Sequence, residues 1–182
     1  MRLTDRAKKV LSYALEEAVS LSRKEIDTGL VFLSMLREPS GVAFHTLKHF
    51  FGFEYSTVKA RVSEMSMAKG NGNGDSLPLF TQTAIRGISK AEQEARALGC
   101  DYIDTEHILL GLLADYRYTS IHLIMPDDRI IQNAIAHLRS PTKDTGKLAL
   151  KIMKVLELYV DDIVQDEVFE KIQSVLDEKK IS

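Results

Sequence analysis

Residues 103–113 read IDTEHILLGLL, and residues 26–36 read IDTGLVFLSML. Both stretches open with Ile-Asp-Thr and continue as an apolar run of helical length, so Thr105 and Thr28 stand where a helix-capping residue is expected. The two stretches are offset by 77 residues, and the same offset relates Thr4 to Thr81. This segment therefore predicts a helix start, and its second copy predicts an internal repeat.

The repeat extends into the residues that flank both stretches. Small and apolar residues recur at steps of three and four, which is the spacing of one helix face. The pairs that share the 77-residue offset are Ala7 and Ala84, Ala14 and Ala91, Leu21 and Leu98, Leu33 and Leu110, and Leu36 and Leu113. Matching caps, core positions and connection lengths predict an all-α fold, in which two units of about four helices bury their apolar faces in one pseudo-symmetric core.

The chain divides into four expected regions. The first repeat covers about residues 1–68, a linker covers 69–78, the second repeat covers about 79–140, and a helical extension covers 141–182. The linker reads KGNGNGDSLP, and its glycines and asparagines resist packing. No Lys-Ser or Lys-Thr follows these glycines, so the segment does not fit a phosphate-binding loop.

Helix boundaries follow from the caps and breakers. In the first repeat we expect helices over 5–22, 30–37 and 42–51, with Gly52 ending the third, and a fourth helix that carries Val58 and Val62. In the second repeat, Asp127 or Asp128 is expected to cap a last helix over 129–138. The extension carries two amphipathic patterns, which predict that it docks on its own domain or binds another chain, for example as a homodimer contact.

Charge and composition restrict the class of partner. The net charge is −2 and no long Lys/Arg run occurs, so binding to DNA or RNA is not expected. No apolar run reaches membrane length, and the N-terminus lacks the apolar centre of a signal peptide. A single cysteine, Cys100, fits a reducing compartment. The chain is therefore expected to be cytoplasmic, with proteins as its partners.

No residue set indicates catalysis, a metal or a cofactor. His45 and His49 lie four residues apart on one expected helix, but no third ligand stands at a suitable spacing, so a solvated pair is favoured over a metal site. Cys100 lies in a polar turn beside Asp101, whose charge disfavours a reactive thiolate. His107 fits a structural role beside a cap. A small hydrolase that uses histidine or cysteine remains the alternative from another class.

The sequence DTEHILLGLL at 104–113, with Thr81 at the head of the preceding helix, resembles a known family. It is similar to the duplicated N-terminal domain of Clp-type AAA+ unfoldases of the ClpC and ClpA kind. In that family each repeat runs from a Phe-Thr cap to Gly-Thr-Glu-His-Ile-Leu-Leu-Gly-Leu. The resemblance covers about residues 1–140 and implies a two-repeat, eight-helix domain that recruits substrates or adaptors.

Two functions are compatible with this resemblance. The sequence contains no Gly-Lys-Ser or Gly-Lys-Thr of a Walker A motif, so it does not supply that ATPase machinery. The chain is then either a non-catalytic adaptor or accessory subunit of a Clp protease, or the excised substrate-binding domain of a larger Clp ATPase. The helical extension favours the adaptor.

The resemblance also implies a ligand site. Some members of the family bind phosphorylated arginine in one pocket per repeat, lined by the cap threonine and by the glutamate of Thr-Glu-His. Carried over by position, Thr81 and Glu106 form the pocket of the second repeat, which would take phosphoarginine or a peptide. Thr4 and Gly29 form a degenerate first pocket without a carboxylate. The alternative is that these residues serve only as caps and as charges at helix starts.

Overall fold

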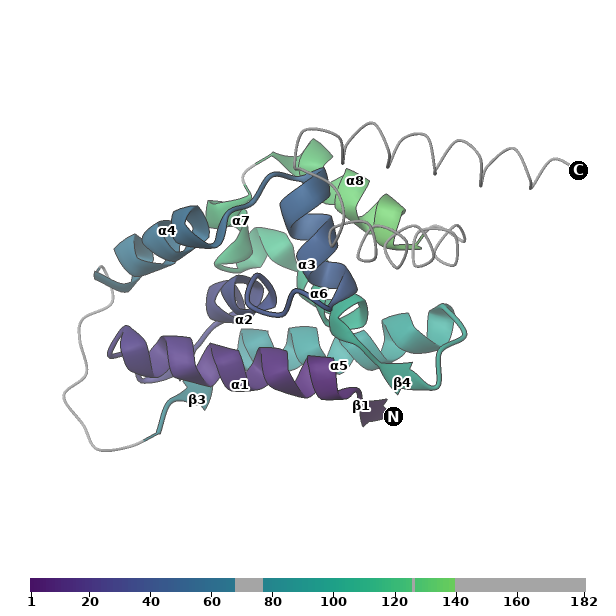
Figure 1. The fold of residues 1–182 in the computed structure, drawn as a ribbon, viewed down its shortest axis with the longest axis horizontal. Helices are drawn as coiled ribbons and strands as arrows, with labels where there is room; N and C mark the ends of the chain where they lie inside the picture. The colour runs from purple at the N-terminus through teal and green to yellow at the C-terminus, as the bar shows by residue number, and fades with distance from the viewer. Residues whose placement is uncertain (68–76, 126, 140–182) are drawn as a thin grey trace, which may run out of the picture. The chain divides into compact units, whose positions relative to one another are not determined.

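A computed structural model describes residues 1–67, 77–125 and 127–139 (Figure 1). The expected extension over 141–182 and most of the expected linker lie outside these residues. Residues Met1–Leu138 belong to one compact unit. No helix in the described ranges is long and apolar enough to cross a membrane.

Each repeat contributes four α-helices in the described ranges, and the expected all-α fold with a duplicated unit is confirmed. The first repeat contains β1 (Arg2–Leu3), α1 (Asp5–Ser20), β2 (Glu25–Ile26), α2 (Thr28–Met35), α3 (Val42–His45), the π-helix η1 (Thr46–Phe50) and α4 (Tyr55–Met67). The second contains β3 (Leu79–Phe80), α5 (Gln82–Ala97), β4 (Tyr102–Ile103), α6 (Thr105–Leu113), the 3-10 helix η2 (Tyr116–Tyr118), α7 (Ile121–Ile124) and α8 (Asp128–Arg139). The first two helices of each repeat start 77 residues apart, as the sequence offset predicts.

The caps of α2 and α6 correct the sequence prediction. Thr28 and Thr105 are the first residues inside these helices, and the residues that cap them are Asp27 and Asp104. Asp27 has an extended backbone, and its Oδ1 accepts the amide of Leu30 at 3.1 Å. A carboxylate is a stronger acceptor than a hydroxyl at the positive end of the helix dipole, which explains why the aspartate takes the cap.

Helix boundaries also differ from the expected ones: α2 spans Thr28–Met35, two residues earlier than expected, and α8 is one residue longer at each end. The first helix ends at Ser20, two residues early, because the chain turns at Leu21. The helix expected over 42–51 divides into α3 and the π-helix η1. Gly52 has a φ of +66° and ends this segment, as predicted, because glycine adopts that conformation without strain.

Four two-residue strands join the repeats, and the sequence predicted none of them. β1 pairs in parallel with β4, and β2 pairs in parallel with β3. Each pair thus takes one strand from each repeat, and Figure 1 shows β1 beside β4 near the chain's N-terminus. The backbone bonding continues into the caps, since the Thr4 amide donates to Ile103 O and the Thr81 amide donates to Ile26 O, both at 2.9 Å.

The centre of the core is formed by α2 and α6, in which every residue is buried. Helices α1 and α5 each bury one face built mainly of alanine, which allows close approach of neighbouring backbones. Helices α5 and α6 approach each other closely at Gly111, where a Cβ atom would lie 2.2 Å from Gly87 O. The fold therefore places the starts of α2 and α6 at the boundary between the repeats.

Candidate functional site

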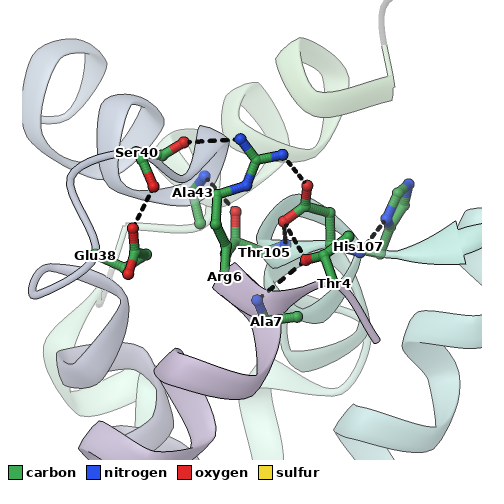
Figure 2. Close-up of polar contacts among 9 residues, drawn as sticks. Thr4, Arg6, Ala7, Glu38, Ser40, Ala43, Thr105 and His107 are labelled. Atoms are coloured by element: carbon green, nitrogen blue, oxygen red, sulfur yellow. Dashed lines mark hydrogen bonds and ion pairs between the residues drawn. The ribbon is translucent and has the colours of Figure 1, made fainter. Parts of the chain in front are cut away.

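The start of α6 meets the start of α1 at a cluster of polar side chains, shown in Figure 2. Thr4 Oγ1 accepts the Ala7 amide at 3.1 Å and donates to Asp104 Oδ1 at 2.9 Å. The Thr105 amide donates to the same Oδ1 at 2.8 Å, and Arg6 Nη2 forms an ion pair with Asp104 Oδ2. We call Thr4, Arg6, Asp104, Thr105 and Glu106 the Asp104 junction.

The charges of the Asp104 junction hold Asp104 ionised. Burial alone would raise the pKa of Asp104, whose side chain is 3% exposed. The hydrogen bonds from Arg6, Thr105 and Thr4 outweigh this effect and keep the pKa below its ordinary value. The pKa of Arg6 is raised by its hydrogen bond to Asp104 and further by the charges of Asp104, Glu106 and Glu38. One arginine therefore faces three carboxylates.

The loop before α3 covers one side of the Asp104 junction. Arg6 Nη1 donates to Ser40 O at 3.2 Å, and the Ala43 amide donates to Thr105 Oγ1 at 3.3 Å. A Cβ atom on Gly41 would lie 2.8 Å from that Oγ1, so glycine is required for this close approach. The guanidinium-bearing side chain of Arg6 is nevertheless 43% exposed. It is the part of this cluster that solvent reaches most readily.

The Thr-Glu-His sequence itself is buried. Glu106 is 2% exposed and His107 is fully buried. His107 Nδ1 accepts the Asp104 amide at 2.9 Å, which completes a capping box at the start of α6. The structural interpretation of His107 therefore fits the geometry.

A second cluster lies at the start of α2, and we call Arg23, Asp27, Gly29, Thr81 and Ser120 the Asp27 junction. Asp27 Oδ2 accepts Arg23 Nη2 at 2.7 Å and Ser120 Oγ at 2.9 Å. Burial opposes ionisation of Asp27, but these bonds and the Leu30 amide hold its pKa below the ordinary value. The Arg23 side chain is only 7% exposed. This junction is thus closed where the Asp104 junction leaves an arginine at the surface.

The structure pairs the predicted site residues differently from the sequence analysis. Thr81 was expected to share a pocket with Glu106, and Thr4 with Gly29. Because the strands pair between repeats, Thr4 is bonded to Asp104 and Thr81 is bonded to Ile26. Thr81 Oγ1 caps α5 by accepting the Ala84 amide at 3.2 Å. Ligand binding by any of these residues stays a prediction.

Gly29 packs against α7. A Cβ atom on Gly29 would lie 3.1 Å from Ser120 Cβ, 3.3 Å from Asp27 Oδ1 and 3.5 Å from Ile124 Cδ1. A side chain at this position would therefore require these neighbours to shift. Gly29, which stands where the second repeat has Glu106, is thus in close contact with the start of α7.

The histidines and the cysteine lie elsewhere. The rings of His45 and His49 are stacked at 5.5 Å, and Phe44 packs edge-on against both. His49 is exposed and His45 is half-buried, so only one of the pair lies on a solvated face as predicted. The described ranges contain no group of three His, Cys, Asp or Glu residues arranged to hold a metal. Cys100 is half-buried, with its thiol 3.8 Å from Leu98 O.

Sequence reasoning did not identify a third buried ionic cluster, centred on Glu17. Its carboxylate accepts the Tyr55 hydroxyl at 2.7 Å and lies 2.9 Å from Arg37 Nη1 and 3.0 Å from Lys59 Nζ. Burial opposes its charge, but these partners hold the pKa of Glu17 below its ordinary value. The sequence did contain a signal for this cluster: Glu17 stands beside Ala18 on the alanine face of α1, so a buried carboxylate could have been predicted there.

These features define a duplicated all-helical module whose two halves are joined by exchanged strands and caps. Residues 2–124 match the family described as the Clp repeat (R) N-terminal domain, and the chain belongs to this family. Among curated proteins, the chain is 37% identical over 114 residues to the chaperone protein ClpB of Oceanobacillus iheyensis. It is also 37% identical over 115 residues to the ATP-dependent Clp protease ATP-binding subunit ClpC of Staphylococcus saprophyticus.

The matched region is 63% of this chain and 14% of each of these two relatives. Solved structures share the fold. The Hsp104 N-terminal domain of Candida albicans has a TM-score of 0.60 at 20% identity, over 77% of this chain and 93% of that one. The N-terminal domain of the chaperone ClpD of Arabidopsis thaliana has a TM-score of 0.57 at 19% identity, over 76% and 96%. The expected family is thereby confirmed.

Proposed function

We propose that this chain is the substrate-binding N-terminal domain of a Clp-type ATPase, a non-catalytic module that presents protein substrates or adaptors to an ATP-driven unfoldase. The observation that carries the proposal is the family match over residues 2–124, which includes the first repeat, the second repeat as far as α7, and both junctions. The relatives with 37% identity are named as a chaperone and as an ATP-binding subunit of a protease. The same proposal places the chain in the cytoplasm.

The second candidate is the adaptor or accessory subunit of a Clp protease. The sequence favoured it through the expected helical extension over 141–182, which lies outside the described residues. The match to a region that makes up 14% of ClpB and ClpC favours the domain of a larger ATPase. The two candidates differ in what the chain should bind: an unfolded substrate in the first case, an assembled Clp ATPase in the second.

Within this function we propose the Asp104 junction as the ligand-contacting surface, with Thr4 taking the place that was expected for Thr81 beside Glu106. Its support is the contrast in exposure between two arginines, since Arg6 is 43% exposed and Arg23 is 7% exposed. Glu106 is buried, so Arg6 is the charged side chain of this junction that a ligand can reach. Binding at this surface should therefore depend on Arg6.

The test uses the full chain and a fluorescently labelled, permanently unfolded protein such as reduced and carboxymethylated lactalbumin. Fluorescence anisotropy should show saturable binding, which Arg6→Ala weakens several-fold. Arg96→Ala is the matched control, because Arg96 is 68% exposed on α5 and pairs only at the surface with Glu92. A parallel titration with a purified ClpC hexamer separates the two candidates.

Binding to the hexamer without binding to the unfolded protein would replace the first candidate with the second. Absence of both interactions up to about 1 mM, the weakest affinity of practical relevance, would refute the proposal. Equal losses in the Arg6 and Arg96 variants would move the ligand surface away from the Asp104 junction.

A further inference from the structure

The Asp104 junction collects three kinds of hydrogen-bond donor at one point. A hydroxyl from Thr4, the helix-start amide of Thr105 and the guanidinium of Arg6 all donate to one carboxylate. Hydroxyls, helix-start amides and guanidinium groups are also the donors that bind phosphoryl oxygens in proteins. In this chain the protein's own Asp104, 3% exposed, occupies the place that such an oxyanion would take.

The Asp27 junction repeats this arrangement from different parts of the chain. Asp27 accepts the helix-start amide of Leu30 at 3.1 Å, the Ser120 hydroxyl at 2.9 Å and Arg23 Nη2 at 2.7 Å. Its side chain is 6% exposed. A hydroxyl from the other repeat and an arginine thus engage the capping aspartate at both helix starts. Because this arrangement of donors around a capping aspartate occurs in both repeats, it is a property of the domain and not of one local contact.

A second anion has no favourable position beside either aspartate. At each junction a hydroxyl, a helix-start amide and an arginine already donate to the aspartate, and a phosphoryl group would bring its negative charge next to a buried carboxylate. Removing the aspartate's charge by protonation is opposed by the bonds that hold the pKa of both residues low. Arg6 also faces Glu38 and Glu106, so its positive charge is already balanced.

We propose that Asp104 is a specificity-determining residue that excludes phosphorylated side chains from the ligand surface, so that the domain binds protein segments whose arginines are unmodified. Asp27 has the same effect at the start of α2. This inference rests on the proposed function and narrows its ligand class, from phosphoarginine or peptide to unphosphorylated peptide. It predicts that the capping aspartate at each helix start, not the fold, sets the preference for unphosphorylated ligands.

The first test compares two peptides that differ only in the phosphorylation of one arginine. Both are titrated into the 15N-labelled full chain, and the amide resonances of Thr105 and Ala7 report binding at the Asp104 junction. The phosphorylated peptide should bind at least about ten-fold more weakly than its unmodified counterpart, a difference of about 1.4 kcal/mol. Equal or tighter binding of the phosphorylated peptide would overturn the inference.

The second test removes the internal anion. Asp104→Gly frees the three donors and should create a response of the Thr105 amide to inorganic phosphate and to free phosphoarginine that the native chain lacks. Asp104→Ser keeps a good capping residue and is the variant to use if Asp104→Gly fails to fold. It should show the same gain of phosphate binding, through Arg6 and Thr4. Asp101→Gly, at an exposed aspartate in the preceding turn, is the matched control.

These outcomes separate the inference from the proposed function. If neither peptide binds the native chain but the Asp104 variants gain the phosphate response, the specificity argument stands and the proposed ligand surface fails. If folded Asp104 variants gain no phosphate response, Asp104 does not occupy an oxyanion position and the inference is wrong.

Discussion

Glu17 should contribute far more to stability than its neighbour Glu16, although both pair with Arg37. Glu17 is 3% exposed and contacts Arg37, Tyr55 and Lys59, whereas Glu16 is 57% exposed and lies 2.7 Å from Arg37 Nη2. Glu17→Gln keeps the size of the side chain and an oxygen for the Tyr55 hydroxyl. It removes the charge that faces the two cations, without opening a cavity.

The expected magnitude follows from exposure. A hydrogen bond to a charged group contributes about 1.5–3 kcal/mol when buried. Arg37 and Lys59 are 29% and 35% exposed, so water partly replaces the lost carboxylate and both pairs fall at or below the low end of that range. We therefore expect Glu17→Gln to lower the free energy of unfolding by about 2 kcal/mol. Glu16→Gln, at the surface, should lower it by about 0.5 kcal/mol or less.

The measurement is urea unfolding of the full-length variants, followed by circular dichroism at neutral pH. Lys59→Met, alone and combined with Glu17→Gln, completes a double-mutant cycle, and the coupling energy should be at least about 0.5 kcal/mol. Equal costs for Gln at positions 16 and 17 would show that burial of the Glu17 carboxylate does not set its contribution. The account of this cluster would then be refuted.

The junction carboxylates and the close-packed glycines give three further expected outcomes. Because the pKa values of Asp27 and Asp104 are held below their ordinary value in the folded chain, their stabilisation is complete above about pH 5 and is lost as the pH falls through the folded-state values. The urea concentration at the midpoint of unfolding should therefore fall as the pH is lowered from neutral to acid. In the double variant Asp27→Asn/Asp104→Asn this midpoint should depend less on pH. Gly111→Ala places a methyl group 2.2 Å from a backbone oxygen of α5 and should lower the free energy of unfolding, measured by thermal unfolding, by at least about 2 kcal/mol. Gly29→Ala should lower it by only about 1 kcal/mol, because the nearest neighbour of its methyl group is a side-chain atom at 3.1 Å. Thr4→Val removes the α1 cap and a bond to Asp104, and should lower the unfolding free energy by about 2 kcal/mol in the same urea assay.

The helices and their duplication were predictable because each depends on local periodicity. Alanines on one face of α1 recur on α5 at the 77-residue offset, and both faces are buried in the structure. Breakers such as Gly52 mark helix ends wherever the backbone needs a positive φ. These signals lie within a few residues of the features that they predict.

The exchanged strands were not predictable by the same reasoning. A strand of two residues has no alternation to detect, and the partner of β1 lies about a hundred residues away. The assignment of Thr81 to Glu106 assumed that each repeat completes its own site, whereas the strand exchange bonds Thr4 to Asp104 and Thr81 to Ile26. The choice between Asp104 and Thr105 as cap was also open in sequence, since both residue types cap helices well.

The exchange of strands has a consequence for the order of events during synthesis. Residues 102–103, which pair with residues 2–3, are made about a hundred codons after them. At about 5–20 residues per second, β1 waits about 5–20 s for β4 to be made, and β2 waits roughly half as long for β3. A chain interrupted between the halves would keep both edges open, and β1 can pair only after translation has run well into the second half.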